Sequence, residues 1–128
     1  MKKNFITILL ILFVPVVAYM AINKSAQSTA RVQDPSKPQV LKFTSTMCLD
    51  CQKMNKVFKN IFPKYENDII LTEIHVQDGS SFTNDEIKKH NVTLVPTIIL
   101  IDSNGKQVRR IEGAIPEEDM DKCLRELK

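Results

Sequence analysis

Two cysteines separated by two residues, Cys48 and Cys51, are the strongest chemical signal in the sequence. They follow a segment rich in β-forming residues, 39–44, and precede an apolar pattern with helical spacing. Backbone N–H groups at the start of a helix stabilise a thiolate, which is the reactive form of cysteine. The sequence therefore predicts thiol–disulfide exchange, with Cys48 as the exposed nucleophile and Cys51 as the thiol that resolves a mixed disulfide.

The same spacing also occurs in metal sites, so two alternatives stay open. One is a copper- or zinc-binding module, although zinc would need two further ligands. The other soft candidates are scattered without ligand spacing: Cys123, His75 and His90. The second alternative is a scaffold in which the pair forms an incidental disulfide. No metal ion or other cofactor is expected at the pair, Cys123 is expected to pack in the core, and the two histidines are expected to have no catalytic role.

The helix after the pair is predicted from one apolar stripe and two end signals. Residues at steps of four and three share one face: Met47, Cys51, Met54, Phe58 and Ile61. Ser45 or Thr46 can cap the first turn, and Pro63 lies just beyond the end. The stripe places Cys51 on the apolar face of the helix.

The remainder of the folded region alternates between strands and helices. The apolar pattern predicts strands over 68–76, 97–102 and 107–112, and helices around 84–90 and after Pro116. Asn104-Gly105 is a hairpin signal, so the last two strands are predicted to be antiparallel neighbours. The order β-α-β-α-β-β-α indicates an α/β three-layer sandwich around a mixed four-stranded sheet, and its first crossover joins parallel strands.

Taken in order, these motifs resemble the thioredoxin-like family. The resemblance covers roughly residues 39–127, and three segments carry it besides the cysteine pair: Val95-Pro96-Thr97, Asn104-Gly105-Lys106 and Glu112-Gly113-Ala114. It implies a thiol–disulfide oxidoreductase that acts on disulfide-bearing proteins. It also implies a cis peptide bond at Pro96 and a substrate-binding role for Val95, Pro96 and Gly113. The family's tryptophan before the pair is replaced by Met47.

Two charged residues depart from the family pattern. Lys42 stands where the family has a buried acid, and Glu73 stands near the position of the lysine that partners that acid. If both side chains point inward, they form a reversed ion pair that could serve as a proton relay to Cys51. The preferred interpretation at this point is simpler, with both charges facing outward from their strands.

The N-terminus carries a membrane signal. The run from Phe5 to Ile22 has no charged residue and follows Lys2 and Lys3. As a helix it would span roughly 27 Å, close to the thickness of a bilayer's hydrocarbon core. We expect residues 1–22 to be an uncleaved anchor or, alternatively, a signal segment removed on secretion. The basic flank places the rest of a single-pass chain outside a bacterial-type cytoplasmic membrane.

Composition divides the remaining chain into a tether and one domain. Residues 23–38 are polar and contain two prolines, which is typical of a tether, so the folded domain is expected over 39–128. The net charge of +3 comes from lysines that flank the apolar run, and the other charges balance. A nucleic-acid partner is therefore not expected. The family's tethered members lean toward reduction, which would require a membrane-embedded electron donor.

Overall fold

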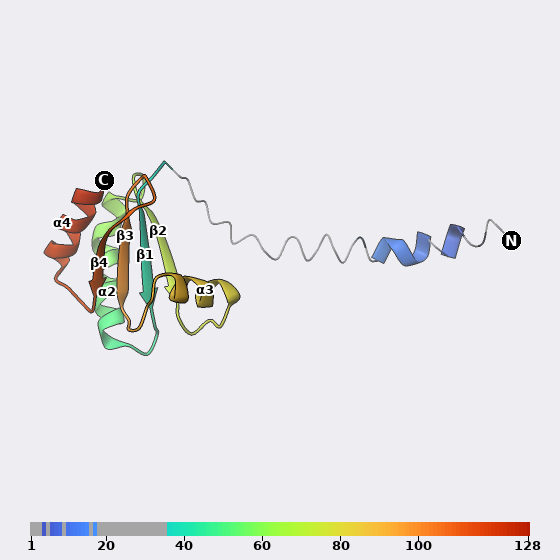
Figure 1. The fold of residues 1–128 in the computed structure, drawn as a ribbon, viewed down its shortest axis with the longest axis horizontal. Helices are drawn as coiled ribbons and strands as arrows, with labels where there is room; N and C mark the ends of the chain where they lie inside the picture. The colour runs from blue at the N-terminus through green and yellow to red at the C-terminus, as the bar shows by residue number, and fades with distance from the viewer. Residues whose placement is uncertain (1–3, 5, 9, 16, 18–35) are drawn as a thin grey trace. The chain divides into compact units, whose positions relative to one another are not determined.

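The computed structural model describes residues 4, 6–8, 10–15, 17 and 36–128 (Figure 1). The chain divides into two units, Met1–Gln33 and Asp34–Lys128. The described residues of the first unit are helical and exposed. Within the described ranges, no helix is both long enough and apolar enough to cross a membrane. The predicted membrane segment lies partly outside these ranges, and the predicted tether lies mostly outside them.

The second unit contains four strands and three α-helices in the predicted order. Its elements are β1 (Gln39–Thr44), α2 (Leu49–Ile61), the 3-10 helix η1 (Phe62–Lys64), β2 (Ile70–His75), α3 (Ser81–Lys89), β3 (Thr97–Ile101), β4 (Gln107–Glu112) and α4 (Glu117–Leu127). The α/β class and the element order are confirmed. Helix α3 begins earlier than expected, because the Ser80 hydroxyl caps it by accepting a hydrogen bond from the Thr83 N–H.

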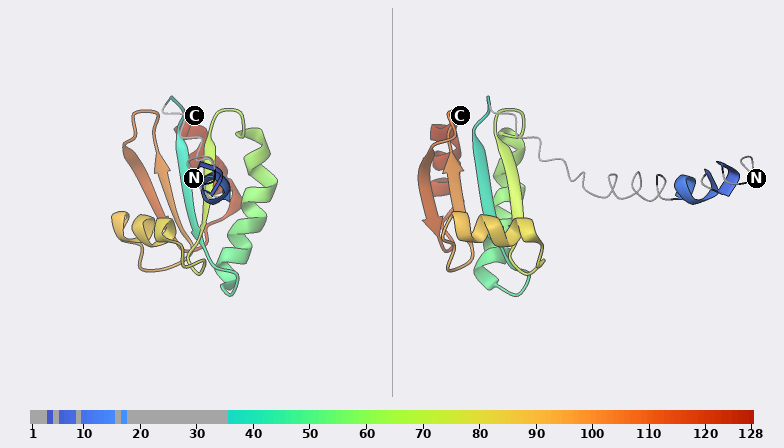
Figure 2. Two further views of the ribbon diagram at one scale, coloured as in Figure 1. Left: turned by 90° about the vertical axis from the view of Figure 1, so that its right-hand side faces the viewer. Right: turned by 45° about the vertical axis from the view of Figure 1, so that its right-hand side comes forward.

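The sheet is mixed, with the order β2-β1-β3-β4. Strands β1 and β2 are parallel, whereas β3 is antiparallel to both β1 and β4. Helices α2 and α4 pack on one face of the sheet, and α3 covers the other (Figure 2). Strand β1 therefore lies inside the sheet with both faces covered, and its side chains from Val40 to Thr44 are buried.

Side chains of β1 alternate between the two layers, as the period of a strand requires. Val40 packs with α2 and α4, whereas Leu41 and Phe43 pack on the α3 side. The face that carries Val40 also carries Lys42 and Thr44, both buried. This alternation places two polar side chains beneath the helix that carries the cysteine pair.

Cys123 lies in the core, whereas His75 is the register partner of Thr44 at the strand end that leads into the pair. Cys123 is buried in the core cluster between the sheet, α2 and α4, so its predicted packing role is confirmed. His75 ends β2, and His90 follows α3 with its ring 6.1 Å from that of Phe43. The absence of a catalytic role for either histidine stays a prediction.

Candidate active site

Cys48 is itself the N-cap residue of α2. Its backbone is extended, with φ −103° and ψ 122°, and its sulfur accepts a hydrogen bond from the Cys51 N–H at 3.2 Å. The expected caps were wrong: the Ser45 hydroxyl accepts instead from the Met47 N–H. The chain turns before the helix begins, so the side chain that reaches the free N–H groups is the cysteine. The helix terminus thus directs one of its free backbone N–H groups at the Cys48 sulfur.

Met47 does not belong to the buried stripe of α2. Its side chain precedes the helix and is 86% exposed, whereas the other four members of the predicted stripe are buried. The predicted apolar stripe extended one position too far toward the N-terminus, because the helical spacing was continued across the turn that positions Cys48. Met47 and Leu49 therefore flank the nucleophile as exposed apolar side chains.

Cys51 lies one turn into α2 and is fully buried. Burial raises the pKa of its thiol, and a hydrogen bond with Cys48 raises it further, whereas the Ser45 backbone and the Thr44 hydroxyl lower it. All three cysteines are free thiols, and Cys48 alone among them is partly exposed. The pair therefore presents one accessible sulfur and one protected sulfur, as a nucleophile and a resolving thiol require.

The loop before β3 lies opposite the pair. The Val95–Pro96 peptide bond is cis, as the resemblance implied. The Cys48 thiol donates to the Val95 carbonyl at 3.6 Å, and the Gly113 N–H donates to the Pro96 carbonyl at 2.8 Å. Gly113 has φ +87°, which favours glycine. The three predicted substrate-binding residues therefore lie together beside the nucleophile, and their roles stay predictions.

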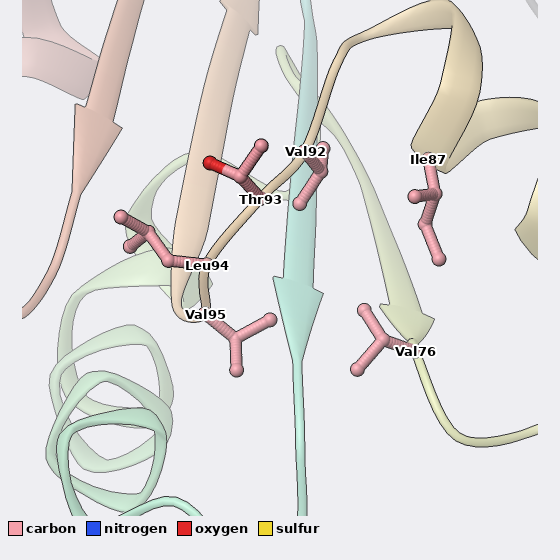
Figure 3. A pocket seen from close by; sticks show the side chains of 6 residues that line it. All are labelled: Val76, Ile87, Val92, Thr93, Leu94 and Val95. Carbon is pink, nitrogen blue, oxygen red and sulfur yellow. The ribbon is translucent and has the colours of Figure 1, made fainter.

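An apolar cavity of about 190 Å³ adjoins this loop. Figure 3 shows its lining, which comes from the end of β2, from α3 and from the loop: Val76, Ile87, Val92, Thr93, Leu94 and Val95. Val95 connects the cavity to the nucleophile, because its carbonyl contacts the Cys48 sulfur. Sequence reasoning missed this feature, although the run of apolar residues before Pro96 was a signal for it.

Lys42 and Glu73 form an ion pair, so the outward-facing interpretation was wrong for Lys42. The two residues are register partners on β1 and β2. The Lys42 side chain is 1% exposed, and its ammonium also donates to the Asn55 side-chain oxygen at 2.9 Å. The same ammonium lies 5.0 Å from the centroid of the Phe58 ring. Lys42 cannot face outward because α2 covers that face of β1.

Residues 25–128 match the family model of the thioredoxin-like domain. The chain belongs to this family. It is 27% identical over 89 residues to thioredoxin Y, chloroplastic, of Oryza sativa subsp. japonica, covering 70% of this chain and 50% of that protein. It is 28% identical over 106 residues to the thiol:disulfide interchange protein DsbD of Campylobacter jejuni, covering 80% of this chain and 18% of DsbD.

The thioredoxin-like fold is also shared with solved structures. Thioredoxin O2 from Arabidopsis thaliana in the oxidized state superposes with a TM-score of 0.62 at 26% identity, covering 84% of this chain and 87% of that one.

The alternative of a metal-binding module can be compared with the structure. The described part of the chain has no cluster of three or more His, Cys, Asp or Glu side chains that could hold an ion.

Proposed function

We propose that the chain is a protein thiol–disulfide oxidoreductase. The observation that carries the proposal is the position of Cys48, which caps α2 and faces the cis Val95–Pro96 bond. The Cys48 thiolate attacks a substrate disulfide, forms a mixed disulfide and releases one substrate thiol. Cys51 then loses its proton and attacks the Cys48 sulfur, so that a Cys48–Cys51 disulfide forms and the second substrate thiol leaves. The substrate gains two electrons and two protons.

The substrates that suit this site are proteins with apolar side chains near the disulfide. Met47 and Leu49 are exposed beside Cys48, and the apolar cavity adjoins it on the other side. An extended substrate segment would lie across Val95, Pro96 and Gly113. A side chain added at Gly113 would meet no protein atom within 4 Å, so a substrate backbone can approach there. Burial of apolar surface would supply most of the affinity.

The domain is proposed to work as a reductant on the outer side of a cytoplasmic membrane. Support comes from the apolar run after Lys2 and Lys3, and from the exposed apolar side chains of its described helical residues. A reductant outside the membrane needs electrons from inside, so a membrane-embedded donor would restore the dithiol. The similarity to part of DsbD, a thiol:disulfide interchange protein, is consistent with such exchange.

Lys42 and Glu73 are proposed as a proton relay for Cys51. Asn55, which binds the Lys42 ammonium, lies one turn after Cys51 on α2. When Lys42 passes a proton to the Glu73 carboxylate, its amine can take up the proton that the thiol releases. The Glu73 side chain is 44% exposed, so the proton can then pass to water. The ion pair would thus connect a buried thiol to solvent.

Activity and direction can be tested together with the purified full chain. The dithiol form is expected to reduce insulin with dithiothreitol as the electron source, whereas the Cys48→Ser/Cys51→Ser chain is expected to show only the background rate. In glutathione buffers the pair should be mostly disulfide, as for a couple more reducing than glutathione. A mostly dithiol pair would reverse the proposed direction, and a background rate for the unaltered chain would favour the scaffold alternative.

Membrane attachment has its own test. The full chain should remain with membranes during alkaline carbonate extraction, because about twenty apolar residues suffice to hold a helix in a bilayer. Deletion of residues 5–22 should release it. A soluble chain that starts near Arg31 would instead indicate a cleaved signal.

A further inference from the structure

Thr44 is a buried side chain that the exchange mechanism above does not use. It ends β1, is 1% exposed, and lies on the face of the strand that α2 covers. Its backbone carbonyl accepts a hydrogen bond from the Val76 N–H at 3.0 Å. Its side-chain oxygen has no hydrogen-bond partner within the described residues of the dithiol state. A buried hydroxyl without a partner is unfavourable, so its presence calls for a physical reason.

The neighbour of this hydroxyl is the resolving thiol. Lys42, two residues before Thr44 on the same face of β1, contacts Asn55, which lies four residues after Cys51 on α2, so the end of the strand lies beneath the turn that carries Cys51. The Thr44 hydroxyl lowers the pKa of that thiol, in opposition to the effect of burial. A hydroxyl can donate one hydrogen bond, and a thiolate accepts it far more strongly than a neutral thiol does. The dithiol therefore holds an unused donor beside the sulfur that must become negative.

We propose that Thr44 is a catalytic hydrogen-bond donor that binds the Cys51 thiolate while this thiolate resolves a mixed disulfide. The proposal rests on the oxidoreductase function above. Thr44 keeps its proton throughout: Cys51 gives up its own proton, its sulfur bonds to that of Cys48, and the substrate sulfur leaves as a thiolate. The donor would raise the amount of Cys51 thiolate at neutral pH, at the expense of folded-state stability in the dithiol.

Groups other than Thr44 also surround the Cys51 thiol. Cys48 faces it from the helix terminus, and the Ser45 backbone supports its thiolate from the loop. Lys42 contacts α2 through Asn55 and forms an ion pair with Glu73, and His75 is the register partner of Thr44 on β2. None of these groups changes in a Thr44→Val variant. Valine has nearly the shape of threonine and lacks only the hydroxyl, so the variant isolates the hydrogen bond.

The resolving step can be timed with 5,5′-dithiobis(2-nitrobenzoate) and the full chain. Cys48 takes up one thionitrobenzoate group, and attack by Cys51 releases it as a coloured thiolate. The Cys51→Ser chain provides the blank. For the unaltered chain, the release rate should rise with pH to a plateau whose midpoint is the pKa of Cys51. If release from the unaltered chain does not exceed the blank, the oxidoreductase proposal itself fails, independently of Thr44.

Thr44→Val is expected to raise that midpoint by about one pH unit, a tenfold loss of thiolate well below it. Because a more basic thiolate is intrinsically more reactive, the net loss near neutral pH should be about threefold. Above both midpoints, the variant should be about threefold faster than the unaltered chain. The two profiles must therefore cross, which a merely structural defect would not produce.

Two control variants complete the test. Thr44→Ser retains the hydroxyl and should keep the original midpoint. Thr83→Val removes a buried hydroxyl of α3 that donates to the Asp78 carboxylate at 2.8 Å, so it should lower stability without moving the midpoint. Thr44→Val should melt no lower than the unaltered chain. An unchanged midpoint in Thr44→Val, or a uniform slowing at every pH, would overturn the role of Thr44.

Discussion

The Cys51→Ser chain is expected to accumulate as covalent adducts with other proteins, whereas the Cys48→Ser chain is expected to form none. The reason is the order of the two attacks. Cys48 is partly exposed and caps α2, so it forms the mixed disulfide, and Cys51 is buried where it can only resolve that bond. Without Cys51 the reaction stops after the first step. Non-reducing electrophoresis, followed by reduction of the shifted bands, measures the adducts.

The double variant Cys48→Ser/Cys51→Ser is the matched control, because it retains Cys123 as its sole thiol. Cys123 is 6% exposed, so this control should remain free of adducts in the folded state. If Cys48→Ser trapped proteins as efficiently as Cys51→Ser, the nucleophile would be Cys51. That result would contradict the geometry in which only the Cys48 sulfur reaches both the helix terminus and the Val95 carbonyl.

Glu73→Ala is expected to destabilise the domain by about 3 kcal/mol, far more than Lys42→Met. Removal of Glu73 leaves the buried Lys42 ammonium, among the described residues, with the Asn55 oxygen and the Phe58 ring as its remaining partners. Lys42→Met fills the same space with an apolar chain and leaves a carboxylate that water can reach. Its cost should be below about 1 kcal/mol. Urea unfolding of the full chain measures both values.

Two further variants test whether the difference in stability loss between Glu73→Ala and Lys42→Met comes from the burial of Lys42. Glu126→Ala removes a carboxylate from an ion pair with Arg109 in which both side chains are about half exposed, and it should cost at most about 0.5 kcal/mol. The double variant Lys42→Met/Glu73→Ala should be close to Lys42→Met in stability, because no unpaired ammonium remains. Equal losses for Glu73→Ala and Lys42→Met would mean that Lys42 is not buried in solution.

The proposed relay adds a kinetic readout to the same variants. Lys42→Met removes the amine that would accept the Cys51 proton, so resolution of the mixed disulfide should slow even though the domain stays folded. An unchanged rate in a folded Lys42→Met chain would leave the ion pair with a structural role alone.

The sequence predicted where the cysteine pair lies in the fold because the signals for that position are local. The spacing of Cys48 and Cys51, the strand before them and the helical stripe after them all lie within one continuous segment. Their order fixed the β-α-β start of the fold, and the Asn-Gly turn fixed the closing hairpin. The cis bond at Pro96 came from resemblance to a family and not from residue physics.

Tertiary structure alone decided whether the polar residues of β1 are buried or exposed. Alternation along a strand assigns residues to two faces, but it does not say whether either face is exposed. Here helices cover both, so Lys42 is buried against its register partner and Thr44 is buried beneath α2. The apolar cavity likewise joins side chains from three separate segments. Such contacts depend on packing between distant parts of the chain, whereas the cysteine pair and its helix depend on neighbours in sequence.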